Sequence, residues 1–262
     1  MSSFVQSKLL PSGHSIPAVA LGVLHSQPGP EAYNAVLTAL KLGYRHIDTA
    51  TAYQNESDVG KAIRDSGIPL DGVRESNRKL GLEYIDLYLL HAPCDSATRA
   101  EAWRALEDMQ TEGLVRDIGV SNFGEKHLVE LSKTWRVKPA VNQVELHPWL
   151  ARPDTVKYCE SQGILMEAYS PLARAKKIDD PVITEVANDL NATPAQVMIA
   201  WSLAKGFIPL PKSVTESRMK SNLESAKLKL SAEQVTKLDS LDSDFVIGWD
   251  PIKDIYALSN NF

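Results

Sequence analysis

The sequence predicts an α/β protein in which parallel strands alternate with helices along one chain. Short apolar runs rich in β-branched residues recur from end to end, and longer segments of helical periodicity separate them. Strands that alternate with helices in this way form a parallel sheet covered by helices. Two closures of the sheet are possible, an open doubly wound sheet and a (β/α)8 TIM-type barrel, and we favour the barrel.

The expected elements follow one another in a regular order. The expected strands are 19–24, 44–50, 84–93, 116–122, 140–146, 165–171 and 207–213, and the expected helices are 31–42, 56–66, 71–80, 98–112, 125–135, 152–162, 193–205 and 215–226. Glycine follows several of these helices, as at Gly43 and Gly163, where a left-handed residue ends a helix. Thr193 before Pro194 and Ser231 three residues before Gln234 are helix N-terminal signatures.

The number of strands is one short of a closed barrel. Seven strand-like runs are visible, whereas a barrel of this type has eight strands. The long interval between 44–50 and 84–93 holds two helical segments and nothing strand-like. No linker rich in proline, glycine and serine divides the chain. We therefore expect one domain over residues 1–262, a barrel that is incomplete because one strand–helix unit is lost between Pro69 and Leu80.

Composition excludes several classes of protein. The 28 Lys+Arg and 33 Asp+Glu give a net charge of −5, so the overall charge favours neither nucleic acid nor an anionic membrane as a partner. No apolar stretch of about 18 residues predicts a membrane span, and the first residues lack a secretory signal. Cys94 and Cys159 have no CxxC spacing, which argues against a disulfide framework or a zinc site. We expect a cytoplasmic monomer without a metal ion.

Polar side chains recur at the C-terminal ends of the expected strands, where the reactive groups of a parallel barrel lie. Asp48, Asn122 and Ser213 could instead cap the helices that follow them. Tyr53 and His91 could be packing residues. Convergence of all these groups on one face favours a functional site. The polar residues at strand ends are Asp48, Tyr53, His91, Ser121, Asn122, Gln143, Tyr169, Ser170, Lys212 and Ser213.

Six motifs occur in one order along the chain: HIDTATAYQNE, GLEYIDLYLLHAP, GLVRDIGVSNF, VNQVELHPWL, AYSPLA and PLPKSVTESRMKSN. With these motifs the sequence resembles the aldo-keto reductase family from about residue 16 to residue 241. The resemblance implies a (β/α)8 barrel that binds NADP(H) in an extended pose. It also implies reduction of aldehydes or ketones to alcohols by hydride transfer, with a small carbonyl compound as substrate.

The resemblance implies roles for individual residues. Tyr53 resembles the general acid that protonates the carbonyl oxygen, His91 the residue that orients this oxygen, and Asp48 the carboxylate that pairs with a catalytic lysine. The implied cofactor-binding residues are Ser121, Asn122 and Gln143 at the nicotinamide carboxamide, Tyr169 stacked on the nicotinamide, Ser170 and Leu172 at the pyrophosphate, and Lys212, Ser213, Arg218 and Asn222 at the adenosine 2′-phosphate and adenine.

Two observations on the residues themselves support NADP over NAD. No GxG occurs in the chain, so a Rossmann phosphate loop is absent and a dinucleotide needs another binding mode. Lys212 and Arg218 place two cations beside the start of an expected helix. Cations next to helix N-terminal amides suit a phosphate monoester.

The family's catalytic lysine has no evident counterpart. In the family it ends the third barrel strand, where this sequence has only LDGVRESNRK. Arg78 and Lys79 come at the end of expected helix 71–80, on the opposite face of the barrel, where they complement the helix dipole. Without the lysine, Asp48 raises the pKa of Tyr53 and makes it a weaker proton donor. The alternative to a reductase is therefore a catalytically impaired NADP-binding protein or a truncated isoform lacking this lysine.

Overall fold

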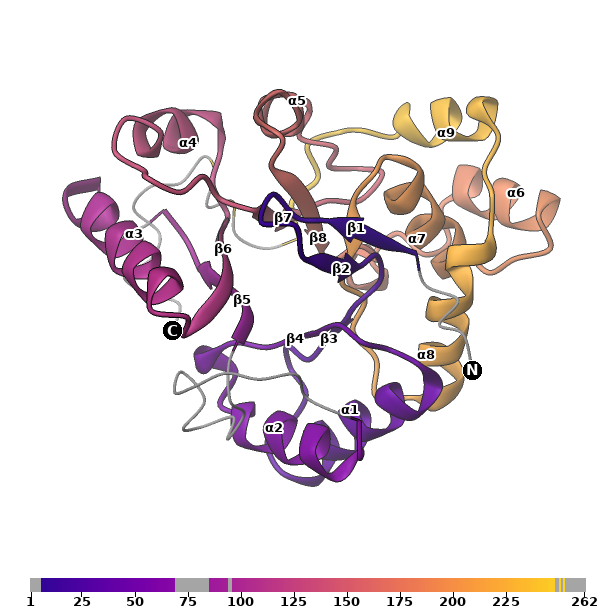
Figure 1. Cartoon of the computed structure of the whole chain (residues 1–262). Helices are drawn as coiled ribbons and strands as arrows, with labels where there is room; N and C mark the ends of the chain where they lie inside the picture. The colour runs from indigo at the N-terminus through magenta and orange to yellow at the C-terminus, as the bar shows by residue number, and fades with distance from the viewer. Residues whose placement is uncertain (1–5, 69–84, 94–95, 248–249, 251, 253–262) are drawn as a thin grey trace.

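Parallel strands curve around a common axis, and helices cover their outer side (Figure 1). The computed structural model describes residues 6–68, 85–93, 96–247, 250 and 252. The parallel strands are β3 (Leu21–Gly22), β4 (Ile47–Asp48), β5 (Ile85–Leu90), β6 (Val115–Ser121), β7 (Val141–Glu145), β8 (Leu165–Tyr169) and β9 (Ile208–Pro209). The helices are α1 (Pro30–Leu42), α2 (Glu56–Asp65), α3 (Ser96–Thr111), α4 (Glu125–Leu131), α5 (Pro153–Gln162), α6 (Pro181–Asp189), α7 (Pro194–Ala204), α8 (Glu216–Glu224) and α9 (Ala232–Asp239).

The strand order is that of a barrel. Five strands pair in the order β5-β6-β7-β8-β9, and β3 and β4 form a second parallel pair. The two sets join at β3, because Ala20 N–H donates to the Pro209 carbonyl at 3.1 Å and Gly22 pairs with Lys212. The last parallel strand thus lies beside the first, as closure of a barrel requires. The barrel prediction is confirmed, and the open doubly wound alternative is wrong.

The arc of strands is open on one side within the described residues. There, β4 pairs with β3 alone and β5 pairs with β6 alone. No strand lies between β4 and β5 in this described part of the chain. The expected helix 71–80, with Arg78 and Lys79, lies outside the described residues.

The expected elements have the predicted order. Each of the seven expected strand runs overlaps an observed strand. Thr193 and Ser231 each form a capping box with the glutamine three residues later. The end of the helix expected at 125–135 was predicted wrongly, because α4 ends at Leu131. After it, the hydroxyls of Ser132 and Thr134 donate to the carbonyls of Val129 and Leu131, which competes with further helix.

A hairpin that the sequence analysis missed covers the N-terminal end of the barrel. Its strands β1 (Ser7–Leu9) and β2 (Ser15–Pro17) pair antiparallel and lie across the centre of the view in Figure 1. The buried side chains Leu10 and Ile16 pack against Ala140, Val141 and Ile208, near the starts of β7 and β9. This end is therefore closed, and the C-terminal ends of the strands are left to form a site.

The main core fills the space between the strands and the helices around them. Buried residues of α3, α4, α6 and α7 pack on β6, β7 and β8, with Trp103, Trp201 and Phe207 among the largest fully buried side chains. None of the helices in the described segments has the length and apolar character needed to cross a membrane.

Replacing Leu131 with alanine is expected to lower the free energy of unfolding by about 2–5 kcal/mol, because the change removes buried methyl groups and leaves a cavity. Leu131 is 2% exposed, whereas Val129 on the same helix is 41% exposed. Val129→Ala is the matched control and is expected to change the stability by less than about 0.5 kcal/mol. Urea unfolding measures both variants. Equal losses would contradict the packing of α4 through Leu131.

Candidate functional site

Gly22 brings three strand ends together at the C-terminal side of the barrel. Its backbone is in register with Asp48 on one side and with Lys212 on the other. A Cβ atom at this position would lie 3.1 Å from the Leu210 carbonyl oxygen and 4.0 Å from Asp48 Oδ2. The absence of a side chain at Gly22 therefore allows the backbone of β3 to lie close to the backbone that follows β9, next to the Asp48 carboxylate.

Tyr53 and His91 meet beside this point. Tyr53 ends the short 3-10 helix η1 (Thr51–Tyr53), and His91 directly follows β5. Their ring centroids are 6.5 Å apart with the planes at 89°, an edge-to-face contact. Burial raises the pKa of Tyr53, and the charge of Asp48 and the neighbouring Tyr169 raise it further. Burial lowers the pKa of His91, so its imidazole is held neutral.

Asp48 faces the barrel interior and is bonded to an amide. Gln143 Nε2 donates to Asp48 Oδ1 at 3.1 Å and to Glu167 Oε2 at 3.0 Å. Burial raises the pKa of Asp48, the charge of Glu167 adds to the rise, and Gln143 and His46 oppose it. Among the described residues, no lysine or arginine side chain hydrogen-bonds to Asp48 or Tyr53.

A second polar cluster joins the ends of β5, β6, β7 and β8. Ser121 Oγ and the Asn122 backbone N–H both donate to the Gln143 carbonyl at 2.9 Å. Asn122 Nδ2 donates to the His91 carbonyl at 2.9 Å, and Tyr169 Oη donates to Asn122 Oδ1 at 3.0 Å. Asn122 adopts a left-handed backbone with φ of +64°. Asn122 therefore links three strand ends through its side chain and a fourth, that of β7, through its backbone N–H.

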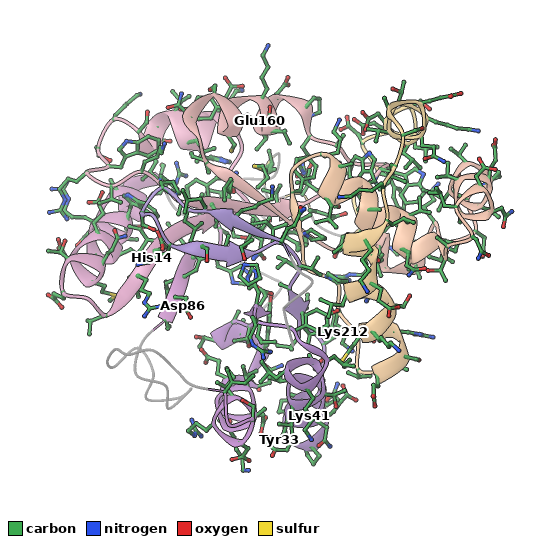
Figure 2. The ribbon with its side chains drawn as sticks, turned by 45° about the vertical axis from the view of Figure 1, so that its right-hand side comes forward. His14, Tyr33, Lys41, Asp86, Glu160 and Lys212 are labelled. Carbon is green, nitrogen blue, oxygen red and sulfur yellow. The ribbon has the colours of Figure 1, made fainter. Side chains whose placement is uncertain are left out.

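The residues expected at the phosphate end continue from the same rim. Lys212 follows β9 and is exposed, and Figure 2 shows it on the same side of the molecule as α8. Arg218 is exposed on α8, and Asn222 on the same helix is buried. Ser213 Oγ accepts from the Thr215 backbone N–H at 3.1 Å and so shapes the turn into α8.

The residues expected at the pyrophosphate follow β8 directly. Ser170 has a left-handed backbone with φ of +47°, and Leu172 precedes the 3-10 helix η2 (Ala173–Ala175). They share the rim with Tyr169 by chain continuity. No hydrogen bond among the described residues joins their side chains to the polar clusters above.

The three helix-cap alternatives are wrong. Asp48, Asn122 and Ser213 are not the N-cap residues of the helices that follow them. The N-caps of α2, α4 and α8 are Asn55, Gly124 and Thr215. The side chains of these three residues, which were predicted to belong to a site, are therefore not helix N-caps.

Sequence reasoning missed two interior residues, His46 and Glu167. Each lies two residues before a residue that was predicted to belong to the site. His46 precedes Asp48 by two residues, and Glu167 precedes Tyr169 by two residues. Alternate residues of a strand point to the same face. That period would have placed His46 and Glu167 inside the barrel with the predicted site.

Comparisons with known proteins agree with this fold. The model of the aldo/keto reductase family matches residues 19–74 and 70–243. An uncharacterized oxidoreductase of Bacillus subtilis, YtbE, is 38% identical over 277 aligned positions, covering 96% of this chain and 98% of the relative. The glyoxal reductase of the same organism is 39% identical and covers 92% of this chain and 95% of its own.

A solved structure gives the same result. The Bombyx mori aldo-keto reductase in complex with NADP superposes with a TM-score of 0.85 at 31% identity, covering 93% of this chain and 94% of the neighbour. The fold and the site thus define a parallel-barrel oxidoreductase. The chain belongs to the aldo-keto reductase family of NADP-dependent oxidoreductases, which reduce carbonyl compounds.

Asn122→Ala is expected to be less stable than Asn122→Gly by about 1 kcal/mol, because only glycine adopts a left-handed backbone without cost. Both variants lose the same side-chain amide, so their difference isolates the backbone at φ +64°. Urea unfolding of the two variants measures it. A glycine variant that is less stable than the alanine variant would contradict the left-handed conformation of residue 122.

Proposed function

We propose that this chain is an NADP(H)-dependent reductase of aldehydes or ketones in which Tyr53 is the general acid. The observation that carries the proposal is the edge-to-face contact of Tyr53 with His91 at 6.5 Å, next to Asp48. A phenol and a neutral imidazole at this distance can both reach one carbonyl oxygen. Tyr53 then donates its hydroxyl proton to that oxygen while His91 orients it.

The amide cluster fits a nicotinamide carboxamide. Gln143 uses Nε2 on two carboxylates, which leaves its oxygen Oε1 as an acceptor. Asn122 uses Nδ2 on the His91 carbonyl, and its Oδ1 can accept a second hydrogen bond besides the one from Tyr169. These two acceptors suit the amino group of a carboxamide, with the Tyr169 ring beside it. When bound, NADPH supplies the hydride that the carbonyl carbon accepts.

The phosphate end supports NADP(H) as the cofactor. Lys212 and Arg218 are both exposed cations, the first following β9 and the second within α8. Ser213 directly follows Lys212, and Asn222 lies four residues after Arg218; both are buried. A 2′-phosphate offers an arginine two oxygens at once, which a ribose hydroxyl does not.

Arg218→Ala is expected to weaken NADPH binding by about 10–100-fold, since hydrogen bonds to charged groups contribute about 1.5–3 kcal/mol. NADH binding should stay unchanged, because NADH lacks the 2′-phosphate. Quenching of tryptophan fluorescence on titration measures both. Lys220→Ala removes another exposed cation from the same helix and is the matched control. An equal loss of NADPH affinity in both variants would contradict a specific contact.

A specific set of observations favours the alternative, a catalytically impaired NADP-binding protein or truncated isoform. The family match consists of two stretches that overlap at residues 70–74, and the alignment with YtbE is longer than this chain. These findings support loss of the third strand–helix unit and of its lysine. Without that cation, the raised pKa of Tyr53 makes it a weak acid.

Tyr53→Phe is expected to lower NADPH oxidation with a small aldehyde by about 10²–10⁴-fold, the usual contribution of general acid catalysis. Binding of NADPH should be retained, because the hydroxyl is proposed to act on the substrate. Absorbance of NADPH measures turnover and fluorescence quenching measures binding.

The wild-type chain decides between the two candidate functions in the same assay. Turnover above background supports the reductase, and NADPH binding without turnover supports the impaired protein. The single domain over residues 1–262, the monomeric state and the cytoplasmic location stay predictions from the sequence.

A further inference from the structure

His46 and Glu167 face each other inside the barrel, below the predicted catalytic residues. His46 immediately precedes β4, and Glu167 is the central residue of β8. Their side chains are 12% and 1% exposed, and His46 Nε2 lies 3.6 Å from Glu167 Oε1. The proposed function assigns neither residue a role.

The hydrogen bonds of His46 fix which ring nitrogen carries a proton. His46 Nδ1 lies 3.3 Å from the Pro17 carbonyl oxygen. A carbonyl oxygen only accepts, so Nδ1 must be the N–H donor. In the neutral ring, Nε2 then carries no proton, and its lone pair is directed toward Glu167.

The hydrogen bonds of Glu167 leave one oxygen in need of a proton. Oε2 accepts from Gln143 Nε2 at 3.0 Å. Oε1 is buried and has no hydrogen-bond partner among the described residues. A buried carboxylate oxygen without a donor is costly, and two lone pairs that face each other repel. A proton on Oε1, facing the lone pair of His46 Nε2 at 3.6 Å, removes both problems.

We propose that Glu167 and His46 hold one proton between them, and that this pair positions charge for the reaction centre. Gln143 Nε2 donates to both Glu167 and Asp48, so the two carboxyl groups are coupled through one amide. With the proton on Glu167, the two carboxyl groups that share the Gln143 amide carry one negative charge and not two. The effect on Tyr53 rests on the proposed function, whereas the location of the proton does not.

The surrounding groups agree with a proton on Glu167. Burial raises the pKa of Glu167 to about 7, with Gln143 opposing the rise. Burial lowers the pKa of His46, against the Pro17 carbonyl and the charges of Asp48 and Asp86. Asp86 lies on β5, is labelled in Figure 2 and pairs with Arg116 at 3.1 Å.

The sign of the pH dependence follows from the raised pKa. The folded chain holds this proton to a higher pH than the unfolded chain does. The stability it contributes is complete below the ordinary pKa of a glutamic acid, and it is lost as pH rises to about 7.

Infrared difference spectroscopy of the full chain without cofactor tests the location of the proton. The wild type is expected to show the carbonyl band of a protonated carboxylic acid below pH 7 and to lose it above. Measured between about pH 6 and 7, above the raised pKa of Asp48, the band should be absent in Glu167→Gln and retained in Asp48→Asn. Glu107→Gln is the matched control, because Glu107 is buried but paired with Arg136 at 2.8 Å. It should retain the band.

The outcomes decide the proposal separately from the proposed function. A band that survives in Glu167→Gln, a band lost in Asp48→Asn, or no band in the wild type would overturn it. If Glu167→Gln does not fold, Asp48→Asn and the wild type still decide. Neither cofactor nor substrate is present, so a chain without turnover can still bear the proposal out.

A pH profile of turnover tests the coupling to Tyr53. The kcat/KM of the wild-type chain for NADPH-dependent aldehyde reduction is expected to fall as pH rises through about 7, since ionised Glu167 then adds a second negative charge to the carboxyl pair that Gln143 joins. Glu167→Gln should remove this fall. A fall that persists unchanged in Glu167→Gln would show that the proton does not act on Tyr53.

Discussion

The site depends on the backbone pairing of β3 with β4 on one side and with the segment after β9 on the other. Val23 N–H donates to the Asp48 carbonyl at 3.1 Å, and Gly22 N–H donates to the Pro211 carbonyl at 3.2 Å. The first bond joins β3 to β4, and the second places the start of the chain's parallel strands beside their end. They also put the carboxylate of Asp48 and the backbone of Lys212 on either side of one glycine. The proposed catalytic end and the proposed phosphate end of the site are therefore neighbours because the barrel closes here.

The polar groups around this closure select the kind of ligand that can bind. Ser121, Asn122 and Gln143 direct their hydrogen-bond donors at carbonyls, hydroxyls and carboxylates of the protein. The amide oxygens of Asn122 and Gln143 are what the cluster offers to a ligand. A fixed set of acceptors favours a ligand that brings its own N–H groups, as a carboxamide does. Because the donors are already engaged, the cluster is organised before any ligand arrives.

Much of the barrel could be predicted from the sequence, because its strands are buried and short. Such strands appear in the sequence as apolar runs. The helices between them end at glycines, and five of these have a positive φ: Gly43, Gly67, Gly113, Gly163 and Gly206. The hairpin of β1 and β2 could not be predicted, since three residues per strand give no readable periodicity. Its stability comes from Leu10 and Ile16, whose partners are distant in sequence.

The predicted site residues were found by their places at strand ends, and the interior residues were not. His91 directly follows β5, and Tyr53 lies in the loop after β4, so a rule about strand ends and the loops that follow them identifies both. Glu167 lies in the middle of β8 with apolar neighbours, where a sequence suggests only a buried strand. Its significance arises from His46 and Gln143, which β4 and β7 bring to it across the barrel. No local sequence pattern predicts these contacts between residues of different strands.

Burial of two carboxyl groups beside one amide sets the electrostatic problem that this barrel must solve. Asp48 and Glu167 both accept from Gln143 Nε2, at 3.1 and 3.0 Å, and the described residues bring no lysine or arginine to either. Two ionised carboxylates in such a place repel each other and lose hydration, so one of them takes a proton. Glu167 is the better candidate, because it is the more deeply buried and faces a lone pair of His46. Neutralising Glu167 leaves Asp48 as the single anion near Tyr53. The carboxyl pair then carries a single negative charge without a cation in the described residues.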